Sequence, residues 1–230
     1  KKPHVLDGFM GFAKALGLEV SPPLWNMPLA DSDQLWASEK LSAGNAAGKP
    51  IAVICPAASK AERNWHAEGY SQTAEHLSAR GFKVVICGGP TTMEKLLAEA
   101  IISRSEFSQG DNEIQNLVGK TSLKQLLAVL KLAHIVIAPD TGPAHMAVTV
   151  GTPVVGLYAH SNPQRTGPYL YPQYVVSAYA AAIQLQYKQS IDQLPWGTRA
   201  KGKDLMMQIS IADVKKTIER VIHDNYPEMR

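Results

Sequence analysis

The run Ile135-Val-Ile-Ala-Pro-Asp140-Thr-Gly-Pro-Ala-His145 decides the fold, because it joins a buried strand to a helix through a tight turn. Its apolar start predicts a strand, and Gly142 and Pro143 predict a turn that opens a helix. Free N–H groups and the helix dipole at such a start attract a phosphate. Asp140 is expected to bind a hydroxyl or amino group, or to cap the helix. For this turn taken alone, a plain capped turn with His145 facing the core is the simpler interpretation.

The same alternation of apolar strands and helices extends on both sides of this run. Strands are predicted at 51–55, 83–89, 116–119, 135–138 and 153–157, and helices at 70–80, 93–102, 122–131 and 144–150. Apolar strands separated by helices of about ten residues indicate right-handed βαβ units and a parallel sheet. A weaker strand at 174–176, an irregular stretch at 178–202 and a capped helix at 210–223 follow. The predicted fold is a doubly wound, Rossmann-like α/β domain.

The chain is divided into residues 1–49, a Rossmann-like domain at 50–209 and a C-terminal helix at 210–230. Residues 5–16 predict an amphipathic helix that Gly17 ends and that needs a partner surface. Residues 21–28 are Pro-rich and extended, and a small-residue turn at 42–50 marks the start of the compact domain. Everything before residue 50 is expected to be a connector.

Composition excludes several classes of protein. The 230 residues are 45% hydrophobic and 19% charged, as in a globular protein, and a net charge of +3 favours no nucleic-acid partner. Cys55 and Cys87 each end an apolar run, which indicates reduced thiols in a core and favours the cytoplasm. No apolar run approaches the ~20 residues of a membrane span. The scattered histidines offer no metal-ligand spacing, so no metal or cofactor is expected.

The loops after the strands are the expected binding region, because ligands of open α/β sheets bind at the carboxyl ends of the strands. After the first strand, Ser59 offers a hydroxyl, and Lys60 and Arg63 offer positive charges. Such a loop can hold a second face of a pyrophosphate, although taken alone it is more often a solvated loop.

Further candidates follow the second and fifth strands. Glu94 comes shortly after a Gly-Gly-Pro turn, where a carboxylate either binds ribose hydroxyls or simply favours the first turn of a helix. Arg165 and Thr166 are candidate phosphate or sugar ligands, whereas His160 by itself is interpreted as structural. The chain has neither G-x-G-x-x-G nor a Walker-type lysine loop, which weighs against a dinucleotide dehydrogenase or an ATPase.

Five segments between residues 51 and 169, in this order, resemble the C-terminal half of glycosyltransferase family 9, the ADP-heptose:lipopolysaccharide heptosyltransferases. They are Ala57-Ala-Ser-Lys-Ala-Glu-Arg-Asn-Trp65, Gly88-Gly-Pro90, Leu117-Val-Gly-Lys-Thr-Ser-Leu123, Asp140-Thr-Gly-Pro-Ala-His145 and Ser161-Asn-Pro-Gln-Arg-Thr-Gly-Pro-Tyr169. The chain departs from the family pattern at Arg63 (commonly Lys), Ala57 (Gly) and Ala159-His160 (Gly-Pro). The resemblance implies a GT-B architecture of two facing Rossmann-like domains, with residues 1–49 as interdomain helix and linker and 50–209 as the nucleotide-sugar-binding domain.

The resemblance also implies roles for individual residues. Ser59 and the backbone of Thr141 and Gly142 would hold the diphosphate, while Asp140 and His145 would orient the sugar phosphate. The implied donor-binding residues together are Ser59, Lys60, Arg63, Glu94, Asp140, Thr141, Gly142, Pro143, His145 and Arg165.

The implied reaction is an inverting transfer of heptose from ADP-heptose to a lipopolysaccharide core acceptor, without an obligatory metal, at the cytoplasmic face of the inner membrane. Acceptor and general base would belong to an N-terminal domain that these residues lack, so the chain alone is expected to bind the donor without efficient transfer. Two alternatives stay open. One is a nucleotide-sugar-binding module without transfer activity, and the other is a different GT-B enzyme, such as a UDP-sugar epimerase or an N-acetylglucosamine transferase.

Overall fold

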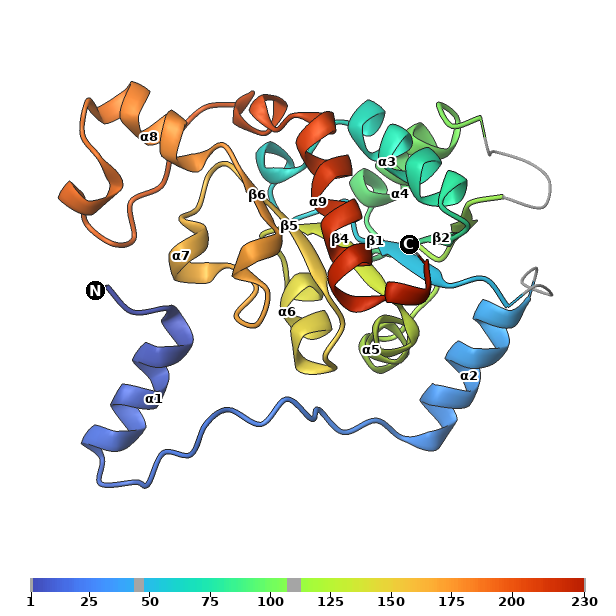
Figure 1. Cartoon of the computed structure of the whole chain (residues 1–230), viewed down its shortest axis with the longest axis horizontal. Helices are drawn as coiled ribbons and strands as arrows, with labels where there is room; N and C mark the ends of the chain where they lie inside the picture. Colours follow the sequence, from blue (N-terminus) through green and yellow to red (C-terminus); the bar gives the residue numbers. More distant parts are fainter. Residues whose placement is uncertain (1, 44–47, 107–112, 230) are drawn as a thin grey trace.

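A six-stranded parallel sheet lies at the centre of the structure, a computed structural model that describes residues 2–43, 48–106 and 113–229 (Figure 1). Its strands are β1 (Ile51–Ile54), β2 (Lys83–Ile86), β3 (Gln115–Asn116), β4 (Ile135–Pro139), β5 (Val154–Tyr158) and β6 (Val175–Ser177). The strands follow the order β3-β2-β1-β4-β5-β6, and all neighbours are parallel. This is the order of a doubly wound sheet, so the predicted fold class is confirmed.

Apart from Lys83 in β2, the central strands β1, β2, β4 and β5 contain no charged residue, because both faces of the sheet are covered. In β1, Ala52 and Ile54 pack into one hydrophobic cluster, whereas Val53 packs into a second cluster on the opposite face, together with the following Cys55. Every residue of β1, β2, β4 and β5 is buried. Cys55 and Cys87 are free and buried, as predicted.

Two layers of helices cover these two faces. One layer contains α3 (Ala67–Ala79), α4 (Thr92–Ile102), α8 (Tyr179–Tyr187) and α9 (Ile211–Asn225), and the other contains α2 (Asp31–Ser42), α5 (Leu123–Leu132) and α6 (Gly142–Thr149). Shorter helical turns are α7 (Pro163–Thr166), η1 (Ala61–Arg63), η2 (Pro172–Tyr174), η3 (Ile191–Gln193), η4 (Leu205–Gln208) and η5 (Pro227–Met229). Figure 1 shows α3 and α4 above the sheet and α5 and α6 below it.

The predicted helix starts are confirmed in detail at two positions. Ser122 and Gln125 form the predicted capping box of α5, in which each side chain accepts a backbone N–H bond from the other residue. The hydroxyl of Ser210 accepts a bond from the N–H of Asp213 at the start of α9. Capping satisfies N–H groups that a helix cannot pair internally.

The stretch 178–202 is not irregular throughout, which corrects the sequence-based expectation. Helix α8 buries Tyr179, Ala182 and Ile183 against the sheet, a set with the i, i+3, i+4 spacing of one helix face. It ends at Lys188, whose φ of +55° is left-handed, although Gly or Asn usually occupies such a position. Because Lys188 stands where a glycine is usual, the sequence contains no clear signal for the end of α8.

The N-terminal helix is confirmed as α1 (Val5–Ala15), followed by Gly17 with a φ of +80°. None of its residues is buried, and Phe9, Phe12 and Leu16 are each about two-thirds exposed. Figure 1 shows α1 at the lower left, away from the sheet, with an extended segment running from it to α2.

Helix α2 is absent from the sequence-based prediction, which expects only a connector before residue 50. It packs on α5 and buries Ala37 and Leu41 in the core of that layer. The ammonium group of Lys83, at the start of β2, donates to the carbonyl oxygens of Leu41 (3.0 Å) and Ala43. Part of the predicted turn at 42–50, residues 44–47, lies outside the described residues.

No helix within the described ranges has both the length and the apolar character needed to cross a membrane.

Candidate functional site

The loops after β1 and β4 meet where the strand order reverses. The chain runs from β1 outward to β2 and β3, and then returns to the other side of β1 with β4. Connections that leave two adjacent strands in opposite directions open a crevice at their carboxyl ends, where doubly wound proteins bind ligands. Arg63 from the β1 loop and Asp140 from the β4 loop meet at this position, with Nη1 of Arg63 3.4 Å from the Asp140 carbonyl oxygen.

Asp140 is the most tightly held carboxylate of this cluster. Its side chain is 16% exposed, its Oδ2 accepts a hydrogen bond from the hydroxyl of Ser161, and its Oδ1 lies 3.9 Å from Nε2 of His145. Burial alone would raise the pKa of Asp140. Interactions with His145 and Ser161 and the charge of Arg63 outweigh burial, so the pKa lies below the ordinary 3.8. Asp140 is therefore a carboxylate that can only accept hydrogen bonds.

Buried Trp65 fixes the loop after β1, here called the β1 loop, and so positions Arg63. The indole N–H of Trp65, two residues later, donates to the carbonyl of Ile209, and the ring is 1% exposed. Nη2 of Arg63 donates to the hydroxyl of Ser59 at 2.9 Å. The structure thus joins Ser59 to Arg63 and Arg63 to the Asp140 backbone.

The start of α6 has the features expected of an anion site. Thr141 occupies the N-cap position, but its hydroxyl donates to the carbonyl of Pro139 and gives the helix no side-chain cap. A Cβ added to Gly142 would meet no atom within 4 Å, so the space beside this backbone is open. Pro143 lies in the first turn, where its missing N–H costs nothing. The helix dipole and the remaining N–H groups favour a negatively charged ligand here.

His145 lies on the outer side of α6. Its side chain is 46% exposed and faces the carboxylate of Asp140. The alternative of a core-facing histidine is therefore wrong, and the side chain is accessible to a ligand beside the helix start.

Glu94 lies apart from this cluster, in the first turn of α4. Its Oε1 accepts the N–H of Gly89 (2.7 Å), and its Oε2 accepts the hydroxyl of Thr91 (2.6 Å). The hydroxyl of Thr91 in turn caps α4. The carboxylate thus stabilises the Gly-Gly-Pro turn and the helix start together.

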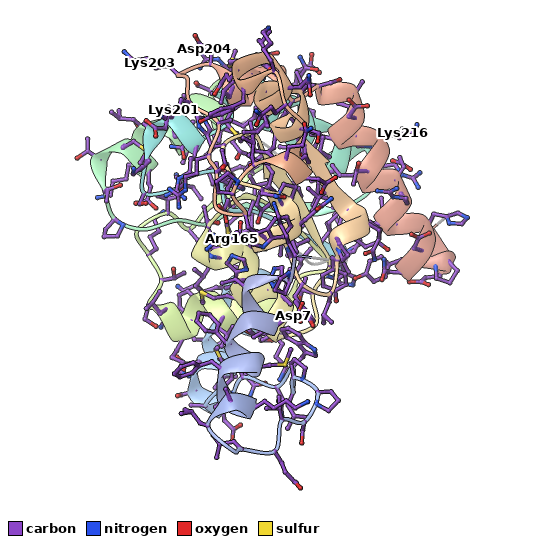
Figure 2. The ribbon with its side chains drawn as sticks, turned by 90° about the vertical axis from the view of Figure 1, so that its left-hand side faces the viewer. Asp7, Arg165, Lys201, Lys203, Asp204 and Lys216 are labelled. Carbon is purple, nitrogen blue, oxygen red and sulfur yellow. The ribbon has the colours of Figure 1, made fainter. Side chains whose placement is uncertain are left out.

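Among the described residues, Lys60 and Arg165, the two remaining predicted cations, form no side-chain bond to Asp140 or Arg63. Lys60 is exposed in the β1 loop. Arg165 lies in α7, and in Figure 2 it lies between Asp7 of α1, below it, and the loop of Lys201 and Lys203 at the top. Its charge contributes to the lowered pKa of His4, although burial is the main cause.

A small pocket next to Asp140 contains residues for which the sequence predicts no binding role. The empty space there, counted together with the open solvent at its mouth, is about 160 Å³. Its lining residues are Arg63, Asp140, Leu157, Tyr158, Ala159, His160, Ser161 and Met206. The sequence contains a signal for Ser161, which stands in the loop after β5 and opens one of the segments that resemble the family, but none for Met206, which lies in η4.

Among the residues that the structure describes, no group of three or more His, Cys, Asp or Glu side chains could hold a metal ion.

The sequence of this chain is similar to those of known proteins. The family model of glycosyltransferase family 9 (heptosyltransferase) matches residues 1–194. Lipopolysaccharide core heptosyltransferase OpsX from Haemophilus influenzae is 38% identical over 212 residues, which cover 92% of this chain and 58% of that protein.

Solved structures show the same fold. The glycosyltransferase family 9 structure from Veillonella parvula gives a TM-score of 0.76 at 22% identity and covers 97% of this chain and 61% of that one. The E. coli heptosyltransferase WaaC with ADP-2-deoxy-2-fluoro heptose gives 0.54 at 20% identity, covering 91% and 53%. This chain therefore spans less than two thirds of the length of each of these three proteins.

Proposed function

Because the chain belongs to glycosyltransferase family 9, the heptosyltransferases, we propose that the cluster around Asp140 binds ADP-heptose for transfer to a lipopolysaccharide core acceptor. One observation carries the proposal: an uncapped helix start, a guanidinium and an ionised carboxylate converge at the point where the strand order reverses. A sugar diphosphate needs these groups, since its phosphates require donors and its hydroxyls require acceptors.

Two relatives support the choice of ligand. The Haemophilus influenzae relative is named a lipopolysaccharide core heptosyltransferase, and WaaC from E. coli was solved with an ADP-heptose analogue. ADP-heptose is therefore the donor to test first.

The charges suggest how the donor would lie. The N–H groups at the start of α6 and the guanidinium of Arg63 would bind the diphosphate, since both attract negative charge. Asp140 would repel a phosphate, so its carboxylate is assigned to the sugar hydroxyls, with His145 beside it. Ser59 would support Arg63 through the bond that already joins them.

These positions fit an inverting displacement. An acceptor hydroxyl would attack the anomeric carbon, the bond from that carbon to the diphosphate oxygen would break, and a general base would take the hydroxyl proton. Groups preorganised around the departing diphosphate stabilise the charge that develops on it, which is commonly the largest contribution to such a rate. In this chain the α6 start and Arg63 are assigned that task.

We assign the general base and the acceptor site to the part of the relatives' length that this chain does not span. The matched region covers 58% of the Haemophilus influenzae relative. A lipopolysaccharide acceptor would place the reaction at the cytoplasmic face of the inner membrane. Donor binding is therefore the function that the described residues can be tested for directly.

Calorimetric titration of the 230-residue chain with ADP, ADP-heptose and UDP tests the proposal. We expect ADP and ADP-heptose to bind and UDP to bind more weakly. Asp140→Ala should weaken ADP-heptose binding, with the thermal unfolding midpoint as the control for folding. A preference for UDP would contradict the heptosyltransferase assignment, and no binding of any nucleotide would contradict the donor site itself.

A further inference from the structure

His160 is a buried histidine in which one ring nitrogen has no hydrogen-bond partner among the described residues. It follows β5 and is 7% exposed, and its Nδ1 lies 3.1 Å from the carbonyl oxygen of Ala200. Its Nε2 is buried and has no hydrogen-bond partner among the described residues. The imidazole lines the small pocket beside Asp140. Buried polar atoms without a partner are rare and call for an explanation.

The bond to Ala200 fixes the tautomer of this ring. A carbonyl oxygen can only accept, so Nδ1 must carry the proton. In the neutral ring, Nε2 then has a free lone pair and needs a donor. The N–H of Ala200 also donates to the carbonyl of His160, at 3.0 Å, so the loop around Ala200 holds this residue from both sides. Figure 2 shows the same loop at the top of the molecule, marked by Lys201 and Lys203.

Arg63, another residue that lines this pocket, also has a polar atom without a partner among the residues that the structure describes. Nε of Arg63 is buried and lacks a hydrogen-bond partner in the described part of the chain, although its two terminal nitrogens are engaged. Two of the described residues in the lining thus have an unpaired polar atom, an N–H on Arg63 that needs an acceptor and a lone pair on His160 that needs a donor. A hydroxyl group can act as acceptor or as donor.

A phosphate does not match this pocket. A phosphate oxygen only accepts, so it would leave Nε2 of His160 unpaired, and the ionised Asp140 in the same lining would repel it. A hydroxyl is neutral and can also face Asp140. The chemistry of the lining residues thus favours a hydroxyl of a sugar over the diphosphate.

We propose that Nε2 of His160 accepts a hydrogen bond from a hydroxyl of the donor sugar. This makes His160 a specificity-determining residue for the sugar, at a position where the family pattern has proline. The inference rests on the proposed function, because it needs the nucleotide sugar to bind beside Asp140.

The test compares ADP-heptose with ADP, since only the first carries the sugar. His160→Phe keeps a ring of similar shape but removes the acceptor, whereas His160→Gln keeps an amide oxygen that can accept. We expect His160→Phe to weaken ADP-heptose binding by about 3- to 10-fold, the usual range for one neutral hydrogen bond, and to leave ADP binding unchanged. His160→Gln should retain part of the difference between the two ligands. Thermal unfolding of each variant checks that it folds.

Three results would overturn the inference. Equal loss of ADP and ADP-heptose affinity would place His160 at the diphosphate, and unchanged affinity for both would show that the pocket holds no sugar hydroxyl. His160→Gln behaving like His160→Phe would exclude the acceptor role. The proposed function fails separately, and the inference with it, if the unaltered chain binds neither ligand.

Discussion

The hydroxyl of Ser161, in the loop after β5, donates a hydrogen bond to Oδ2 of Asp140, the first residue after β4. Ser161 is 8% exposed, and the bond fixes the orientation of the carboxylate from a neighbouring strand. The pairing of β4 with β5 brings the two residues together although 21 positions separate them in the chain. Asp140 is therefore positioned before any ligand arrives.

Removal of this hydroxyl should loosen the carboxylate. We expect Ser161→Ala to weaken ADP-heptose binding by about 1 kcal/mol, or roughly 5-fold, because Asp140 loses a bond that also favours its ionised form. Ser161→Thr keeps the hydroxyl and should restore binding. Calorimetry with ADP as the second ligand separates positioning from damage to the fold, since a general defect would lower both affinities. Threonine failing to restore binding would contradict the role of the hydroxyl.

Arg63 should matter more than its neighbour Lys60. Arg63→Ala removes the cation that contacts both Ser59 and the Asp140 backbone, and we expect ADP affinity to fall by about 1.5–3 kcal/mol, the range for a hydrogen bond to a charged group. Arg63→Lys keeps the charge but not the forked geometry, so its loss should be smaller. Lys60→Ala is the matched control, and an equal loss in Lys60→Ala would contradict the assignment of Arg63.

Two histidine caps should make stability depend on pH. Nδ1 of His4 accepts the N–H of Leu6 at the start of α1, and Nδ1 of His66 accepts the N–H of Gly69 at the start of α3. Burial disfavours the charged form and lowers the pKa of both rings below 6.5. Protonation also removes the lone pair that accepts the cap bond. The contribution of the two caps is complete above pH 6.5 and is lost as the pH falls below it.

Thermal unfolding between pH 7.5 and pH 5 tests this dependence. The midpoint should fall toward pH 5, and His66→Asn should fall less, because asparagine caps a helix without titrating. The same decrease in the variant and in the unaltered chain would exclude His66 as a source.

Gly69 should tolerate no side chain. A Cβ at this position would lie 2.6 Å from ring atoms of Trp65, whose burial anchors the β1 loop. We expect Gly69→Ala to lower the free energy of unfolding by about 1–3 kcal/mol. Gly11→Ala in α1 is the control, since a Cβ there meets nothing within 4 Å and alanine favours a helix. Urea unfolding should show a loss only for Gly69→Ala, and equal results would remove the steric explanation.

The sheet could be predicted from the sequence because its strands are buried on both faces and therefore form short, continuous apolar runs. Helix α2 could not, since only Ala37 and Leu41 of its residues are buried, and their partner α5 lies about eighty residues further on. Helix α8 had a usable spacing of Tyr179, Ala182 and Ile183, but no glycine marked its end.

The sequence predicts those site residues that a local pattern marks, and it misses the contacts that form only when distant segments pack together. A position shortly after a strand is visible in the sequence, and it marks Asp140, Gly142 and Arg63 as candidates. The bond from Ser161 to Asp140 depends on strand pairing, and the bond from His160 to Ala200 depends on a loop 40 positions away. Whether the predicted residues bind the donor stays a prediction.

A crystal structure of the 230-residue chain with ADP-heptose would locate the bound donor directly. We expect the diphosphate at the start of α6 beside Arg63, with the sugar facing Asp140. Nucleotide density at any other place, or a diphosphate in contact with Asp140 and remote from the α6 start, would contradict this assignment.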